Sequence, residues 1–418
     1  MYPAPRIEEK ASGQQSAMAA LLLIGLFWPT STNGEHSELC ILTAFAILLG
    51  LLLYLAYRNG TRRGAGFVAL SILIILTACT LEAVLFGSSQ FDWGVFAKFC
   101  SLAILLSLNL RGISADRSID FAFLVANIVN SISGAAILGG ADWISGFLPK
   151  YYWSFYPELI PTMIALHKPV LTLGTHASAA FFFYLFFWVN WENYKHKRSR
   201  LVLFFVFSYF VLLCGLTSFT SIGFGTVALL QMISWYWRDK RRVFWAGAMC
   251  TILIVTVAFR IFGEQINDWT VVADLGSKFF NTETNGPLIR YGGGGLSRPA
   301  VDYVLNHPLS QIGFGTPPAL AGGPAALGDS GPIEYLLRGS LPVLILMYFG
   351  LYRFLRFNLS LRIHAVMLFL TMVAFESAFS LLIYVRTLYL LPFFVIYLNR
   401  AVEVHRLDGD SRPVPRPI

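Results

Sequence analysis

Apolar runs of about twenty residues recur along the whole chain, and they limit the possible folds more than any other feature. A helix needs about 20 apolar residues to cross the hydrocarbon core of a bilayer. Because 56% of the 418 residues are hydrophobic and only 13% are charged, the soluble domains that this length would otherwise suggest are excluded. The sequence predicts an all-α polytopic membrane protein with about twelve transmembrane helices. The runs lie near 17–32, 39–57, 65–87, 93–109, 119–141, 173–192, 201–218, 221–237, 244–262, 333–352, 365–379 and 380–398.

Lysine and arginine gather in alternate connections between these runs, which indicates the orientation in the membrane. Basic connections face the cytoplasm, so both termini are predicted to be cytoplasmic and the loops near 142–172 and 263–332 external. The formal net charge of +8 is explained by these connections, and it does not indicate binding of nucleic acid. The basic connections are 58–63, 111–117, 195–200, 238–242 and 353–362.

The predicted organisation has four parts. Residues 1–262 form a bundle of about nine helices, 263–332 form a large external loop of short helices, 333–400 add about three helices, and 401–418 form a loose cytoplasmic tail. No internal repeat is visible, which argues against an inverted-repeat transporter. The five cysteines lie far apart within or beside apolar runs, so neither a disulfide framework nor a zinc site is expected.

The external loop carries the first candidate anion ligand. Ser297–Asn306 has the pattern of a short amphipathic helix, and Arg298 stands at its start. Free N–H groups and the helix dipole favour an anion there, so a guanidinium at this point suits a phosphate or pyrophosphate. The alternative is a simple surface pair between Arg298 and Asp302, four residues apart.

Two further candidates lie on either side of this helix. Arg290 precedes Gly292–Gly295, where the backbone can approach a ligand closely, although four glycines also make a flexible linker. His307, before Pro308, has the chemistry of a general base near neutral pH. A histidine in that position can equally cap the end of a helix.

Three more candidates flank the predicted spans. Lys168 is suited to act as a point charge for phosphate, and His176 stands where the next span begins. Both residue types also serve as plain interfacial anchors. Asp329 precedes the span that follows the large loop, where it is either an acid–base group or part of a helix cap.

Charged residues within apolar runs are costly in hydrocarbon and point to function. Six runs carry one each, all toward the predicted external end, which suggests a polar cavity that opens outward with four basic residues against two acidic ones. That excess suits an anionic substrate. Alternatively, the two acidic residues pair with Lys98 and Arg386, and the remaining arginines reach the interface. The six are Glu82, Lys98, Arg260, Arg338, Glu376 and Arg386.

Taken together, these residues resemble the O-antigen ligase and polymerase superfamily of polytopic glycosyltransferases. The resemblance covers the plan of about twelve spans with a long external loop before the last helices. Within that loop, Arg298 followed by His307-Pro308-Leu309 and Gly313-x-Gly315 is similar to the family's loop signature. Lys168-Pro169 with Gly174-Thr175-His176 resembles its other external signature, and Gly331–Leu341 resembles the helix that closes the loop.

The resemblance implies transfer of a glycan from undecaprenyl pyrophosphate to an acceptor hydroxyl at the external face of the bacterial inner membrane. No metal or other cofactor is implied. Flippases and chain-length regulators of polysaccharide assembly are the implied protein partners. The implied pyrophosphate ligands are Arg298, Arg290, Lys168, Arg338 and Arg260, and the implied candidates for the base are His307, His176 and Asp329.

Two departures from the family pattern guide the choice within it. Asp329-Ser330 stands where many ligases have His-Asn, which favours a polymerase of lipid-linked repeat units over a ligase that passes glycan to lipid A core or protein. Thr220-Ser221 stands where an arginine often follows the seventh span, so one phosphate ligand of the family is missing. An alternative of another class is a lipid-linked oligosaccharide flippase, which would also hold cations in a cavity.

Overall fold

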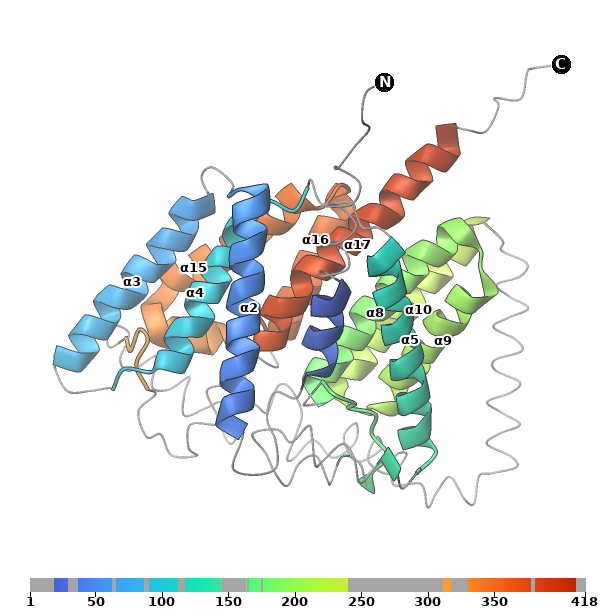
Figure 1. Ribbon diagram of the computed structural model, residues 1–418, viewed down its shortest axis with the longest axis horizontal. Coiled ribbons are helices and arrows are strands. Elements are labelled where there is room, and N and C mark those ends of the chain that lie inside the picture. Colours follow the sequence, from blue (N-terminus) through green and yellow to red (C-terminus); the bar gives the residue numbers. More distant parts are fainter. Residues whose placement is uncertain are drawn as a thin grey trace, which may run out of the picture.

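The computed structural model (Figure 1) is a helical assembly. It describes residues 19–28, 37–61, 65–85, 90–111, 117–141, 143–144, 163, 165–173, 176–239, 311–316, 330–376 and 380–410. Within these ranges the secondary structure is helix with short connections, and β-structure is limited to isolated antiparallel bridges, which join Thr61 to Leu108 and Phe91 to Gly315. The prediction of an all-α protein is confirmed for these ranges.

Each helix coincides with one of the predicted apolar runs. Residues 19–27 form the first helix, and the run at 244–262 lies outside the described residues. The remaining helices are α2 (Ser37–Asn59), α3 (Ala65–Leu85), α4 (Trp93–Ser107), α5 (Arg117–Leu138), α8 (His176–Lys197), α9 (Arg200–Gly215), α10 (Phe219–Asp239), α15 (Gly331–Asn358), α16 (Arg362–Glu376) and α17 (Val385–Asp410).

Membrane association follows from the length and apolar character of these helices. Ala65–Leu85, Ser118–Leu138 and Gly331–Asn358 are long and apolar enough to cross a bilayer. Large apolar side chains also stay exposed on α3, where Phe67 and Leu85 are 75% and 81% exposed, as expected of a surface that faces lipid. The total of twelve transmembrane helices, the inner-membrane location and the orientation stay predictions.

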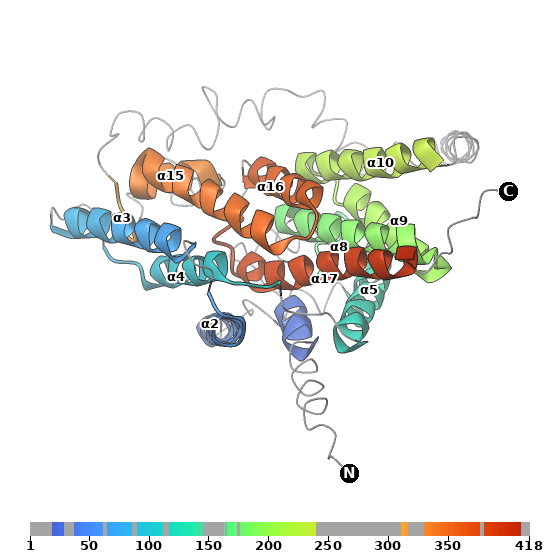
Figure 2. The same cartoon turned by 90° about the horizontal axis from the view of Figure 1, so that it is seen from above.

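The helices fall into two groups with a central element between them. α2, α3, α4 and α15 lie on one side, α5, α8, α9 and α10 lie on the other, and α16 and α17 lie nearer the middle (Figures 1 and 2). α17 packs against α8 on one flank and against α2 and α4 on the other. α8 is buried all round over Ala177–Trp191, because its sequence there is apolar and aromatic on every face.

Amide side chains join helices inside the second group. Asn127 of α5 and Asn190 of α8 exchange two hydrogen bonds, at 3.1 and 3.0 Å. Asn130 donates to the hydroxyl of Tyr209 on α9 at 3.2 Å. In hydrocarbon, polar groups satisfied in this way hold helices together.

Connections predicted to share a side of the membrane do gather at a common end of the bundle. Thr61 bridges to Leu108, the guanidinium of Arg111 donates to the carbonyl of Phe357, and the amide of Ser360 donates to Asn399 at 2.8 Å. These contacts join three of the chain's connections and α17 across sequence separations of up to 246 residues. Which end faces the cytoplasm stays a prediction.

α17 extends further than the sequence analysis expected. The helix continues to Asp410, through the first part of the segment predicted to be a loose tail. The tail's prolines begin only at Pro413, so the extension of the helix from 401 to 410 contains no proline.

Candidate functional site

α15 is broken into two helices near its start, and this break organises the candidate site. Gly339 and Ser340 leave helical geometry, with φ/ψ of −155°/24° and 57°/−163°. Pro342 follows two residues later and cannot donate a backbone hydrogen bond to the preceding turn. The values at Ser340 belong to a region that only glycine usually adopts, so the surrounding contacts must hold this residue in place.

The carbonyls freed by the break are bonded by residues 311–316, the Gly-x-Gly segment of the loop predicted to be external. The amide of Ile312 donates to the carbonyl of Leu337 at 3.2 Å, and the amide of Gly313 donates to that of Arg338 at 2.9 Å. The side-chain amide of Gln311 donates to the hydroxyl of Ser340. The segment therefore completes the open end of the first half of α15, where helix carbonyls lack partners.

The other side of the segment is fixed to α3 and to the turn before α4. The amide of Phe314 donates to the hydroxyl of Thr80 at 2.7 Å, and its carbonyl accepts from the amide of Asp92 at 2.9 Å. Gly313 has φ +56°, and a Cβ there would lie 2.3 Å from the carbonyl oxygen of Leu76. Only glycine satisfies both the backbone angle and this close approach.

Arg338 is the side chain that joins the segment to α15. Its Nη1 donates to the carbonyls of Gly313 and Gly315 at 2.9 and 3.2 Å. Its Nε and Nη2 both lie 3.0 Å from Oε1 of Glu334, one turn earlier in the helix. The side chain is 3% exposed, and the Phe99 ring lies 6.0 Å from the guanidinium carbon. All three nitrogens of the guanidinium thus have close polar contacts.

Two buried carboxyl groups belong to this region: Glu334 contacts Arg338 directly, and Glu376 bonds to Tyr335 of the same helix segment. The Oε2 of Glu334 accepts from the hydroxyl of Ser380 at 2.8 Å. Glu376, at the end of α16, is 0% exposed, and its Oε1 accepts from the hydroxyl of Tyr335 at 3.1 Å and from the amide of Leu382 at 2.5 Å. We name Glu334, Arg338 and Glu376 the buried charge cluster.

The second oxygen of Glu376 faces the start of α15. A Cβ at Gly331 would lie 1.5 Å from Glu376 Oε2, so this residue must be glycine for the carboxyl to fit. Oε2 is buried and has no hydrogen-bond partner among the described residues. The positive end of the α15 helix dipole lies at that position, and its field favours negative charge there.

Lys98 on α4 lies close enough to this cluster to interact electrostatically with Glu334 and Arg338. It is half-buried, whereas Glu82 is exposed on α3. The predicted gathering of buried charge therefore includes Lys98, Arg338 and Glu376, and Glu334 joins it. Among the described residues, this gathering therefore has two basic and two acidic side chains, and the predicted excess of basic residues, which included Arg260, stays a prediction.

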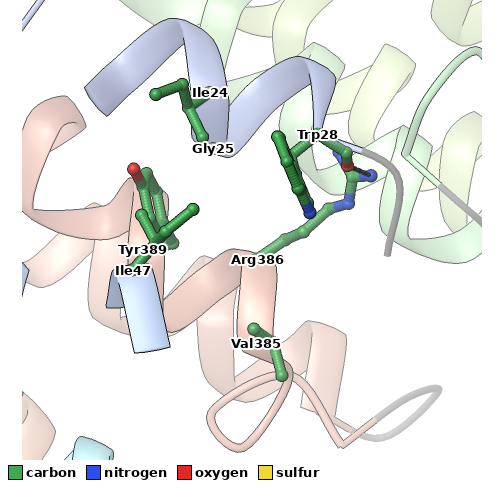
Figure 3. Close-up of a pocket in the computed structure, with 7 residues that line it drawn as sticks. All are labelled: Ile24, Gly25, Trp28, Ile47, Val385, Arg386 and Tyr389. Atoms are coloured by element: carbon green, nitrogen blue, oxygen red, sulfur yellow. Dashed lines mark hydrogen bonds between the residues drawn. The ribbon is translucent and has the colours of Figure 1, made fainter. Parts of the chain in front are cut away.

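Arg386 lies apart from the cluster. Its two terminal nitrogens donate to the carbonyls of Leu26 and Trp28, at 2.6 and 3.0 Å, where the first helix ends. An open pocket of roughly 290 Å³ lies beside it, between the first helix, α2 and α17 (Figure 3). Apart from Arg386 the lining is apolar or aromatic, and it includes no member of the buried charge cluster. The lining residues are Ile24, Gly25, Trp28, Ile47, Val385, Arg386 and Tyr389.

The loop that contains Lys168, predicted to be external, is connected to the buried charge cluster through residues 380–384. The hydroxyl of Tyr384 donates to the carbonyl of Leu173 at 3.2 Å, while Ser380 of the same connection bonds to Glu334. Lys168 lies in that loop and is only 4% exposed, and its amide donates to the carbonyl of Met163 at 2.8 Å. The Lys168 loop and the broken α15 are therefore held together at one end of the bundle.

The predicted site residues divide into two sets. Arg338 and Lys168 are buried at this end, and His176 is half-buried at the start of α8. The others lie outside the described residues, so their predicted roles stay predictions. These are Arg298, Arg290, Arg260, His307 and Asp329.

Three features of this region were not found from the sequence. Glu334 was missed although it stands four residues before Arg338, the spacing of a helical ion pair. The break was missed although Gly339-Ser340 before Pro342 is a sequence that interrupts helices. The bond between Thr80 and the segment had no sequence signal, since threonine in an apolar helix usually bonds its own preceding turn.

In chemical terms, this arrangement can hold one end of a loop rigidly at a polar region of the helix bundle. The same region contains buried groups able to accept or donate hydrogen bonds. Comparison of the chain with protein-family models, with curated proteins and with solved structures finds no match. The functional argument therefore depends on the residues and on the resemblance of their motifs.

Proposed function

We propose that the protein is a membrane polysaccharide polymerase that joins lipid-linked repeat units at the external membrane face. The observation that carries this proposal is the meeting of the two external signatures at one end of the bundle. Gly313 and Gly315 are bonded to Arg338, and the Lys168 loop reaches the same cluster through residues 380–384. Two separate loops that converge in this way could enclose a substrate at the membrane surface.

The proposed reaction needs two kinds of group. The hydroxyl of one repeat unit attacks the anomeric carbon of another, the bond from that carbon to the pyrophosphate oxygen breaks, and undecaprenyl pyrophosphate leaves with the electron pair. A base takes the hydroxyl proton, for which His307, His176 and Asp329 are candidates. Fixed cations stabilise the charge that develops on the leaving group. We assign this role to Arg298, Arg290, Lys168 and Arg260.

The polymerase can be tested with purified protein and synthetic undecaprenyl-pyrophosphate repeat units, with EDTA present. A ladder of products with increasing repeat number is the expected result. Transfer of a single block to a foreign acceptor, without a ladder, would identify a ligase instead. If lipid-linked substrate crosses the bilayer of proteoliposomes and no glycosidic bond forms, the protein is a flippase.

A variant pair tests the assigned cations. Arg298→Ala is expected to abolish the ladder while single repeats accumulate, because the leaving pyrophosphate loses a ligand. Arg362→Ala is the matched control, since Arg362 is exposed at the start of α16 in a basic connection predicted to be cytoplasmic. Equal ladders from the two variants would remove Arg298 from the site.

A further inference from the structure

Arg338 was expected to bind pyrophosphate, but its surroundings indicate a different task. Glu334 lies beside two of its nitrogens, and the carbonyls of Gly313 and Gly315 receive bonds from the third. A phosphate ligand needs positive charge directed at open space, whereas this charge is compensated by a neighbouring carboxylate. The planar guanidinium presents Nε and Nη2 to Glu334 while Nη1 bonds both carbonyls of the segment, and the single nitrogen of an ammonium group cannot make both sets of contacts in the same geometry.

The segment that Arg338 bonds is held from three sides. α15 accepts its Ile312 and Gly313 amides, Thr80 of α3 accepts its Phe314 amide, and the turn before α4 exchanges backbone bonds with it, including one from Thr316 to Gln90 at 2.7 Å. Its apolar side chains are buried, with Ile312 and Phe314 at 2% and 1% exposure. A loop end seated in this way has a single defined position.

We propose that Arg338 is a positioning residue that keeps residues 311–316 seated in the break of α15. The seated segment fixes one point in the C-terminal part of the loop predicted over 263–332, and His307 stands only four residues before Gln311. The consequence for catalysis rests on the proposed polymerase function, whereas the seating itself does not. Arg338 thus acts on the reaction through the segment and makes no contact with the phosphates.

The native thiol of Cys79 provides a measure of seating that does not depend on activity. Its Sγ lies 3.7 Å from Oε1 of Gln311. A Gln311→Cys variant, treated in membranes with dibromobimane as a short thiol crosslinker, should form the 79–311 crosslink, observed by mass spectrometry of the peptides. The matched background is Gln311→Cys combined with Cys79→Ser, which should form none.

The crosslinking rate is then compared between proteins with arginine and with lysine at position 338. In the Gln311→Cys protein, Arg338→Lys should lower the crosslinking rate at least fivefold, because lysine keeps the charge but its single nitrogen cannot bond Glu334 and the carbonyls of Gly313 and Gly315 together. Arg362→Lys in the same protein should leave the rate unchanged. A rate equal in the two variants would overturn the proposal. Thr80→Val provides a second route if the lysine variant does not fold. It removes the hydroxyl that accepts from the Phe314 amide and donates to the Leu76 carbonyl of its own helix, and it should also lower the rate.

Rescue of activity distinguishes positioning from phosphate binding. Arg338→Lys should lose at least tenfold in polymer formed, and crosslinking residue 311 to Cys79 should restore most of it, because the crosslink replaces the lost bonds. An arginine that binds pyrophosphate could not be replaced in this way, so failure of rescue in a crosslinked, folded protein would overturn the proposal. If the unmodified protein makes no polymer, the polymerase assignment fails, and the crosslinking rates still decide the role of Arg338.

Discussion

The two ends of α15 show contrasting ways of placing polar groups in an apolar bundle. At the Asn358 end, a neutral amide accepts from the amide of Leu110 at 2.8 Å and donates to the carbonyl of Leu108 at 3.1 Å. At the Gly331 end, the buried charge cluster surrounds a break in the helix, with a non-glycine residue in a rarely adopted conformation. At the Asn358 end the buried polar side chain is neutral and the helix is regular, whereas at the Gly331 end the buried side chains are ionisable and the helix is irregular.

This contrast distinguishes buried polar groups that stabilise the fold from buried polar groups of the candidate site. Asn358 joins α15 to the turn after α4, and its own carbonyl receives a bond from Asn399 at 2.6 Å, so both its amide and its carbonyl are bonded. Glu376 keeps one buried oxygen without a hydrogen bond among the described residues, and Ser340 keeps an unfavourable backbone angle. An unbonded buried oxygen and a strained backbone angle both cost folding free energy. They persist only where the surrounding structure enforces them, which is common at functional sites.

The largest effect is expected from Gly313→Ala. The added methyl would meet the Leu76 carbonyl and the Thr80 hydroxyl at 2.3 Å and would also occupy a backbone angle of φ +56°. The segment should leave the break, and polymer formation should fall below detection. Gly223→Ala on α10 is the control, since a methyl there meets nothing within 4 Å. Normal polymer from Gly313→Ala would show that the segment need not be seated.

Asn358→Ala should affect stability and leave the chemistry intact. Removing the amide leaves the Leu110 N–H and the Leu108 carbonyl buried without this partner, at a cost of roughly 2 kcal/mol. Denaturation in mixed detergent micelles should show the loss, while the activity per folded molecule stays at the level of the unmodified protein. If Asn358→Ala lost as much specific activity as Gly313→Ala, the two ends of α15 would not differ in the way described above.

Glu376→Gln should cost about 1 kcal/mol of stability. The retained carbonyl oxygen can still accept from Tyr335 and Leu382, but the new NH₂ group would face the positive end of the α15 dipole at Gly331. The same denaturation measurement gives the size of the loss. No loss at all would mean that the field at the start of α15 does not stabilise the carboxyl group.

Ser340→Gly should have the smallest effect. Glycine adopts this backbone conformation at little cost, which should stabilise the fold by about 1 kcal/mol, offset in part by loss of the Gln311 bond. Thermal unfolding should therefore change little, and polymer formation should stay normal. A marked loss of stability would show that the hydroxyl contact outweighs the backbone strain.

Much of the fold was readable from the sequence because a bilayer leaves few choices. An apolar run of about twenty residues has to satisfy its own backbone hydrogen bonds, so the runs at 65–87, 119–141 and 333–352 predicted helices that the structure contains. Charge within an apolar run is itself a sequence signal, and it marked Lys98, Arg338 and Glu376 as unusual. The motif Gly313-x-Gly315 also identified the segment that the broken helix bonds.

The partners of those residues were decided only by the tertiary structure. Sequence pairing suggested Glu82 with Lys98 and Glu376 with Arg386, but Glu376 bonds to Tyr335 and Leu382, and Arg386 bonds to the end of the first helix. Side chains on different helices meet according to how the helices pack and rotate, which cannot be read from the residue pattern of each helix alone. For the same reason Arg338, which resembled an anion ligand in the sequence, lies against Glu334 and two loop carbonyls in the folded protein.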